Sequence, residues 1–270
     1  MVGDGCEFDR HGVSVKADEM TSPKQRLTVA WFSGGVSSAV AIKLAIDTID
    51  RICFIDINDH HEDTGRFVQD CEAWFGKPVV TMRSTYRSVA EVCFCAGYIN
   101  SPHGAPCTNW LKKRPRKEWE RQQTRPLRYV WGMDADEADR CLRLRDAMPK
   151  QEHICPLVEG GLGKKDAHEA LRASGIRRPA MYDLGYHNNN CVGCVKGGMG
   201  YWNKIREDFP DVFADRALME RDIGASCING VYLDELEPDR GRHAPPICDD
   251  CGIFCEIIAL AQAREEVRDE

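Results

Sequence analysis

Residues 27–38 read Leu-Thr-Val-Ala-Trp-Phe-Ser-Gly-Gly-Val-Ser-Ser and decide the fold. The first six are apolar enough to predict a short buried strand. The two glycines permit a tight turn, and apolar residues then recur at helical spacing from 36 to 49. Because a helix N-terminus offers free N–H groups and a partial positive charge, this pattern predicts an anion-binding loop. The alternative is a tight turn with a serine helix cap.

Strands and helices alternate beyond this stretch. The pattern predicts strands at 51–57, 78–82 and 128–131, and helices at 63–75, 166–174 and 201–223, the last interrupted at Pro210. Alternation of this kind predicts parallel βαβ units. We therefore expect an α/β fold with an open, mostly parallel, Rossmann-like sheet and flanking helices, which binds ligands beyond the carboxyl ends of its strands. The expected organisation is a loose arm at 1–26, an α/β domain at 27–205 and a small Cys-rich helical annex at 206–270.

The composition is that of a globular protein. The 270 residues include 43% hydrophobic and 29% charged residues, which argues against wholesale disorder, and the net charge of −7 argues against polyanion binding by the whole surface. No apolar run is long enough for a membrane span, and the first residues lack the apolar segment of an export signal. We therefore expect a cytoplasmic protein without membrane contact.

Cysteine is the unusual component, with 14 in the chain. Cytosolic cysteines are kept reduced, so clusters indicate metal binding or catalysis. Cys191 and Cys194 form a Cys-x-x-Cys pair in a Gly/Asn-rich loop, a chelating spacing for zinc or an iron–sulfur cluster; the alternative is a redox or incidental pair. Cys248, Cys251 and Cys255 form a second metal-like cluster, for which structural packing is the alternative. Buried packing is the simplest expectation for Cys53, Cys71 and Cys141.

Several segments resemble one family in the same order along the chain. Residues 33–38 resemble the Ser-Gly-Gly-x-Asp-Ser loop of the PP-loop ATP-pyrophosphatase superfamily, and Ser37 in place of Asp points to its phosphoadenosine phosphosulfate (PAPS) reductase branch. Residues 56–64, 106–112, 132–140, 156–166 and 182–194 resemble later motifs of that family, with Asp134 where the family has Arg. The resemblance covers roughly 27–205 and implies binding of ATP or PAPS. The implied nucleotide-binding residues are Ser33, Gly34, Gly35, Ser37, Ser38, Asp56, Glu137 and Arg140.

Not all of these residues require a ligand. Glu137 and Arg140 have the spacing of a surface ion pair on a helix, which is the alternative to nucleotide binding. The run 60–63, His-His-Glu-Asp, could hold Mg²⁺ with Asp56 or Asp59, or form a solvated loop and helix cap.

The resemblance also implies a metal centre and reactive groups. Iron–sulfur members of the family use a Cys-Cys pair upstream of their Cys-x-x-Cys; this chain has Cys107 alone, which with Cys191 and Cys194 gives three ligands for a 4Fe–4S cluster or zinc. The sequence around Cys251 faintly resembles the family's nucleophilic tail, although neighbouring acids would raise the pKa of its thiol. Lys112 resembles the family's phosphate-clamping lysine.

Three functions remain open. The first is reduction of an adenylylated sulfate, in which a cysteine thiol attacks the sulfonyl sulfur and a thioredoxin-like reductant resolves the intermediate. The second is ATP-dependent adenylylation followed by sulfur transfer to tRNA or DNA by means of a cysteine-bound iron–sulfur cluster. The third is a nucleotide- or nucleic-acid-binding module without catalysis.

Residues 112–128 are strongly basic. Three interpretations are open for this stretch. It is a track for a nucleic-acid backbone with Trp110 and Trp119 as stacking groups, or a clamp in which Lys112 binds nucleotide phosphate. The third interpretation is a solvated helix face.

Overall fold

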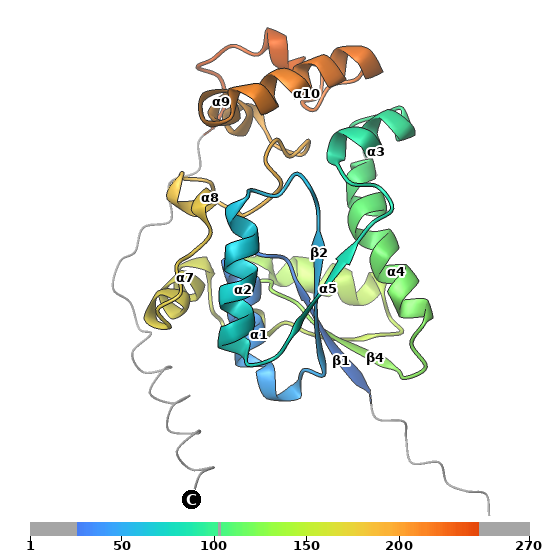
Figure 1. The fold of residues 1–270 in the computed structure, drawn as a ribbon, viewed down its shortest axis with the longest axis vertical. Helices are drawn as coiled ribbons and strands as arrows, with labels where there is room; N and C mark the ends of the chain where they lie inside the picture. Colours follow the sequence, from blue (N-terminus) through green and yellow to red (C-terminus); the bar gives the residue numbers. More distant parts are fainter. Residues whose placement is uncertain (1–25, 102–103, 243–270) are drawn as a thin grey trace, which may run out of the picture.

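The computed structural model describes residues 26–101 and 104–242 (Figure 1). Five strands form one open sheet in the order β3-β2-β1-β4-β5, and every neighbouring pair is parallel. The predicted α/β class and parallel sheet are thus confirmed. The strands are β1 Leu27–Phe32, β2 Arg51–Asp56, β3 Val79–Arg83, β4 Leu127–Val130 and β5 Glu152–Ile154.

Helices connect and flank these strands. The α-helices are α1 Val36–Leu44, α2 Asp63–Phe75, α3 Val89–Ala96, α4 Arg114–Arg121, α5 Ala138–Ala147, α6 Pro156–Glu159, α7 Lys164–Ala173, α8 Ala180–Asp183, α9 Met199–Asp208 and α10 Pro210–Ile223. Short 3₁₀ turns are η1 Ile46–Thr48, η3 Ala135–Glu137 and η4 Leu233–Glu235, and η2 Thr108–Lys113 is a π-helical turn.

Alternating side chains of the strands build a core on each face of the sheet. Ala30 and Phe32 of β1 pack into one core with side chains of α1, α2 and α7. Val29 and Trp31, which point the opposite way, pack with Trp119 of α4. This two-sided burial follows from the period-2 alternation of side chains in a strand and explains why β1 is apolar throughout.

The strand order reverses its direction at β1. The chain runs from β1 outward through β2 and β3, then returns to the other side of β1 for β4 and β5. Connections on the two sides of β1 therefore diverge at its carboxyl end, where open α/β sheets bind ligands. The glycine turn at residues 33–35 occupies that position.

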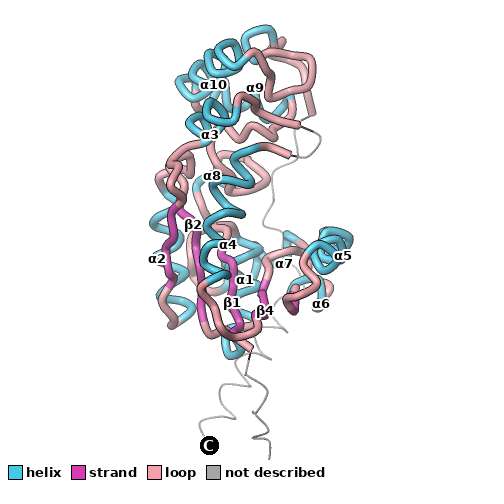
Figure 2. The backbone as a smooth tube through the Cα atoms, turned by 90° about the vertical axis from the view of Figure 1, so that its right-hand side faces the viewer, coloured by secondary structure: helices cyan, strands magenta, loops and turns pink. Residues whose placement is uncertain are grey.

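A group of helices lies beyond the carboxyl ends of the strands. Figures 1 and 2 show α9 and α10 at this end of the molecule, with α3 beside them. Their buried residues form a continuous core that includes Val92, Trp202 and Met219. The boundary expected between 205 and 206 falls inside α9, so α9 and α10 belong to one packed unit. The Cys-rich part of the expected annex lies outside the described residues, as do 1–25.

Local details differ from the sequence expectation. The first helix ends at Leu44 and continues as η1, because Ala45 leaves helical geometry and the Thr48 hydroxyl bonds the Ala45 carbonyl oxygen at 2.8 Å. Helix α3 and the three-residue β5 were not predicted, since both are too short for a clear period. Cys141, expected to be a packing residue, is paired with Cys155 in a disulfide.

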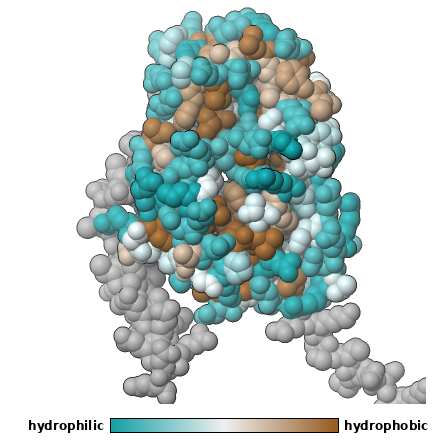
Figure 3. Space-filling model, viewed as in Figure 1, coloured by the Kyte–Doolittle hydropathy of each residue, from teal (hydrophilic) through white to brown (hydrophobic). Residues whose placement is uncertain are grey.

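The exposed surface is mixed in character. On the face in Figure 3, hydrophilic side chains surround separate apolar patches. Within the described residues, none of the helices combines the length and apolar character that a membrane span requires.

Candidate functional site

The turn after β1 has the backbone geometry of an anion-binding loop. We call Ser33–Ser38 the α1 loop. Gly34 has φ +76°, a conformation that favours glycine, and a Cβ there would lie 3.2 Å from the Thr64 methyl carbon. The first N–H that bonds back along α1 is that of Ala39, to the Gly35 carbonyl at 3.1 Å. The N–H groups of Ser37 and Ser38 therefore have no partner within the helix, which is the arrangement that binds phosphate at helix N-termini.

The serine hydroxyls have different roles in this loop. The Ser38 hydroxyl donates to the Gly35 carbonyl at 2.8 Å and accepts from the Ser33 hydroxyl at 2.8 Å. Ser38 is buried, so its hydroxyl shapes the loop instead of facing a ligand. Ser33 is exposed and Ser37 is half-buried. Of the three predicted hydroxyl donors, Ser37 remains open to a ligand, because the Ser33 hydroxyl already donates its hydrogen to Ser38.

Gly132, which follows β4, supports the loop from behind. A Cβ at this position would lie 2.2 Å from the Ser38 Cα atom, a distance that real structures do not show. The strand end and the first turn of α1 therefore touch backbone to backbone. A side chain at Gly132 would displace the α1 loop.

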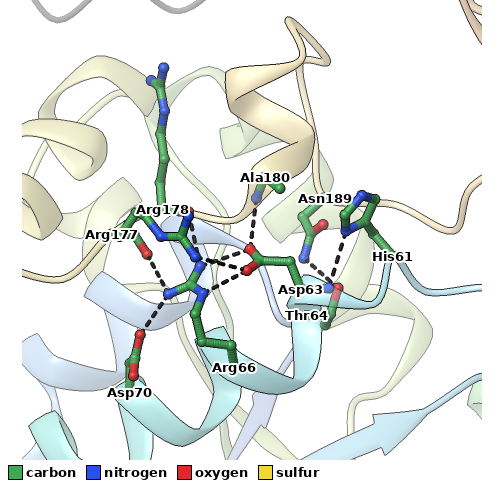
Figure 4. A network of polar contacts seen from close by, with 9 residues as sticks. All are labelled: His61, Asp63, Thr64, Arg66, Asp70, Arg177, Arg178, Ala180 and Asn189. Carbon is green, nitrogen blue, oxygen red and sulfur yellow. Dashed lines mark hydrogen bonds and ion pairs between the residues drawn. The ribbon is translucent and has the colours of Figure 1, made fainter. Parts of the chain in front are cut away.

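Two side chains from a distant segment hold the loop in place. The backbone N–H of Val36 lies 3.4 Å from the Tyr182 hydroxyl oxygen, which also accepts from the backbone N–H of Asn189. The Asn189 side-chain amide donates to the Gly34 carbonyl at 2.7 Å and contacts the Thr64 hydroxyl at 3.3 Å, as part of the network in Figure 4. Burial raises the pKa of Tyr182, so its hydroxyl stays neutral as a hydrogen-bonding group.

The predicted acidic and basic nucleotide ligands are engaged in ion pairs. Asp56, at the end of β2, bonds Arg83 at 2.7 Å. Glu137 and Arg140 bond each other as the surface pair that their spacing allowed. Asp134 is buried, and burial followed by the charge of Glu137 raises its pKa, whereas Lys164 nearby lowers it. Lys164 therefore brings a positive charge close to Asp134.

Three predicted metal ligands lie within electrostatic range of one another. Cys107 and Cys194 interact electrostatically, and Cys191 interacts with both, although 84 residues separate Cys107 from Cys191. Burial raises the pKa of Cys107, and that of Cys191 to about 12. Lys112 and Lys196 act in the opposite direction on Cys107. We call Cys107, Cys191 and Cys194 the thiol group.

The thiol group does not fit a metal as it is placed. No set of three or more Cys, His, Asp or Glu side chains in residues 26–101 and 104–242 is arranged to hold a metal ion. Cys191 is buried and Cys194 is half-exposed, so Cys194 is the accessible thiol of the pair. Cys248, Cys251 and Cys255, predicted as ligands and in one case as nucleophile, lie outside the described residues.

Asp59 anchors the loop that carries Cys191 and Cys194. Its carboxylate forms an ion pair with Arg216 of α10, in which both side chains are 8% exposed, and accepts from the Val89 N–H at 2.7 Å. Its carbonyl accepts from the Val192 N–H at 2.7 Å, and Arg216 reaches the Gly193 carbonyl at 3.4 Å. This buried pair joins the loop after β2, α10 and the cysteine loop.

The run 60–63 forms the entrance to helix α2. Asp63 bonds Arg66 through both carboxylate oxygens, at 2.6 and 2.8 Å, and accepts from the Ala180 N–H at 2.9 Å (Figure 4). The His61 ring nitrogen accepts from the Asp63 N–H at 3.1 Å. Burial and then the charge of Lys112 lower the pKa of His60 to about 4. The run therefore leads from the loop after β2 into α2, and Glu62 at the helix N-cap forms no side-chain cap.

In the structure, some cations of the basic stretch 112–128 form ion pairs and others do not. Arg116, Arg125 and Arg128 form ion pairs with Glu120, Asp50 and Glu152. Trp119 is buried against Trp31 at 5.7 Å between ring centroids, so the expectation that it stacks on bases is wrong.

Trp110 is also engaged. It lies between Tyr86, at 4.7 Å, and the Arg114 guanidinium, at 4.2 Å. Within the described residues, the cations of this stretch without an ion-pair contact or ring contact are Lys112, Lys113, Lys117 and Arg121.

Some residues of the site could not have been selected from the sequence. Asn189 is one of three consecutive asparagines, and Asp59 and Arg216 are 157 residues apart. A glycine directly after a predicted strand was a usable signal for Gly132. No family model matches the chain and no curated protein matches it, so the resemblance of these motifs enters below as a proposal.

Proposed function

We propose that this chain is a PAPS-reductase-like enzyme that binds an adenine nucleotide through the α1 loop and performs sulfur chemistry at cysteine thiols. One observation carries the proposal: the thiol group lies beside an anion-binding loop at the carboxyl edge of a parallel sheet. Asn189 touches that loop and is two residues from Cys191, so loop and thiols are neighbours. The proposal that the nucleotide carries adenine rests on the resemblance of the sequence motifs.

Charges near the loop suit a nucleotide. Lys112 is exposed, and its charge acts on both Cys191 and His60. It lies within the π-helical turn η2, a distortion found often at functional sites. A lysine there neutralises phosphate or sulfate charge next to the thiols.

The reductase reaction has two steps. A thiolate attacks the sulfonyl sulfur of PAPS, a sulfur–sulfur bond forms, the bond to the phosphate oxygen breaks, and adenosine 3′,5′-bisphosphate leaves. A thiol of a thioredoxin-like reductant then attacks the cysteine sulfur, which releases sulfite and forms a disulfide. Sulfur(VI) is reduced to sulfur(IV) while two thiols are oxidised. Cys251 remains the first candidate for the attacking thiol, and Cys194 is the accessible candidate among the described residues.

The nucleotide site is tested by Gly35→Val. A Cβ at Gly35 would lie 3.2 Å from the Tyr182 hydroxyl oxygen, so the branched side chain displaces Tyr182 and covers the N–H groups of the loop. Calorimetry with ATP and with PAPS should show loss of binding. Gly198→Val is the matched control, because Gly198 is also an extended glycine before a helix and has open space around its Cβ position. Equal affinity of both variants and the parent would move the site elsewhere.

Product analysis separates the two enzyme functions. Reduction releases sulfite, and Cys251→Ser should abolish that release without loss of nucleotide binding. Adenylylation releases pyrophosphate, and the sulfur transfer that follows releases AMP. Binding without any of these products would leave a non-catalytic module.

One observation favours the adenylylating sulfurtransferase as the second candidate. Lys113, Lys117 and Arg121 recur at every fourth residue along η2 and α4, which begin directly after Cys107. A cationic row that starts at the thiol group suits a nucleic-acid acceptor.

A further inference from the structure

The segment from Tyr182 to Cys194 connects the two halves of the candidate site. We call it the strap. Near its start, Tyr182 accepts hydrogen bonds from the N–H groups of Val36 and Asn189. Near its end, the Cys194 N–H bonds the Tyr201 hydroxyl at 2.8 Å, and that hydroxyl donates to the Cys191 carbonyl at 3.1 Å. The strap thus begins on the α1 loop and ends at two members of the thiol group.

Asn189 is the strap's side-chain contact with the glycine turn. Its amide nitrogen lies 2.7 Å from the Gly34 carbonyl oxygen, and Gly34 is the residue of the turn with positive φ. The bond fixes the orientation of the peptide between Gly34 and Gly35, and hence the direction in which the Gly35 N–H points. Asn189 is 9% exposed, so water does not compete for this bond.

The other end of the Asn189 amide is unsatisfied. Its Oδ1 atom is buried and has no hydrogen-bond donor among the described residues. An unpaired buried acceptor has a free-energy cost. The hydrogen bond from the Asn189 amide nitrogen to Gly34 therefore forms while the oxygen of the same amide stays unpaired. A shift of the loop or of the strap changes which of the two ends of the amide is satisfied.

We propose that Asn189 is a positioning residue that couples occupancy of the α1 loop to the accessibility of Cys194. The inference rests on the proposed nucleotide binding. An anion that takes the N–H groups of the α1 loop fixes the Gly34 peptide. Asn189 then holds the strap, and the Cys191–Cys194 turn is ordered because its other anchor, the Val192 N–H bond to Asp59, is already fixed. In the free protein the turn opens more often.

The test measures thiol alkylation in the full-length protein. Iodoacetamide labelling of the peptide that contains Cys191 and Cys194 is followed by mass spectrometry with and without saturating ATP. We expect ATP to slow labelling of Cys194 several-fold in the parent protein. In Asn189→Ala, ATP affinity should fall about tenfold, as expected for one buried hydrogen bond, and at saturating ATP the labelling rate should no longer respond.

Two further variants separate coupling from folding. Asn189→Asp keeps the shape of the side chain but removes the N–H donor, and should also lose the response. Asn190→Ala is the matched control, because Asn190 is the exposed neighbour, and should respond like the parent.

The outcomes distinguish this inference from the proposed function. ATP binding without any change in Cys194 labelling would overturn the coupling and leave the nucleotide site intact. A full response in both Asn189 variants would show that another residue transmits it. Failure of ATP and PAPS to bind the parent would instead overturn the proposed function, and the coupling with it.

Discussion

The role assigned to Asp63 changes once its partners in the structure are known. In the sequence it belongs to a run that could hold Mg²⁺. In the structure its two carboxylate oxygens are occupied by Arg66, Arg177 and the Ala180 N–H. These contacts, the Arg66 bonds first, lower the pKa of Asp63 from 3.8 to about 2. The residue therefore fixes the start of α2 to the segment before α8.

This shift gives a dependence of stability on pH. Because the folded-state pKa is below the unfolded one, the stabilisation is complete above about pH 4 and is lost as the pH falls toward 2. We expect Asp63→Asn to lower the free energy of unfolding at pH 7 by about 1 kcal/mol, after allowance for solvent screening. Urea unfolding at pH 7 and at pH 2.5 measures the difference, which should shrink at the lower pH.

Asp70→Asn is the control for that measurement. Asp70 bonds the same Arg66 but its side chain is 43% exposed. It should cost less stability than Asp63→Asn. An equal cost, or a cost for Asp63→Asn that persists at pH 2.5, would show that the carboxylate charge of Asp63 is not what stabilises this corner.

At the scale of elements, helix α4 has a buried side that packs against the protein and an exposed side that carries positive charges. Its buried side carries Pro115 and Trp119, and Arg116 packs beside them with 12% of its side chain exposed. Lys113, Lys117 and Arg121 recur at every fourth residue, so they share one face. All three are exposed, and no ion-pair contact neutralises them within the part of the chain that the structure describes.

This face should bind a polyanion. We expect the triple change Lys113→Gln, Lys117→Gln and Arg121→Gln to weaken binding of a labelled single-stranded RNA, measured by fluorescence anisotropy. Three lost phosphate contacts should reduce the slope of log affinity against log salt by about 2. The control changes three exposed cations elsewhere to Gln, at Arg143, Lys150 and Lys165. If both triple variants weaken RNA binding equally, the binding depends on the net charge of the protein and not on this face.

At the scale of the whole molecule, the metal prediction names cysteines from distant chain segments, which residues 26–101 and 104–242 of the structure do not arrange as a metal site. Anaerobic purification of the full chain, with iron, sulfide and zinc quantitation, tests it. A 4Fe–4S cluster should give about four irons per chain and a broad absorption band at about 400 nm. The double change Cys191→Ser and Cys194→Ser should remove the metal, whereas Cys53→Ser, at a buried strand position, should retain it. Absence of both iron and zinc from the parent would contradict the prediction and leave free thiols.

The sequence by itself determined the α/β class, the position of the glycine turn between β1 and α1 and most strands and helices. Strand β1 and helix α2 were predicted with the bounds that are observed, since their periodicity and their glycine boundaries are local properties of the chain. The glycines of the α1 loop were predictable for the same reason, because a tight turn between strand and helix constrains the backbone of the residues that form it.

Only the tertiary structure decided which side chains meet. Asn189 meets Gly34 and Arg216 meets Asp59, although these pairs lie 155 and 157 positions apart in the chain. Chemistry of the residue type does not select one asparagine among three neighbours or one arginine among many. Burial does, because a polar group removed from water must find its partner wherever the packing of strands and helices places one.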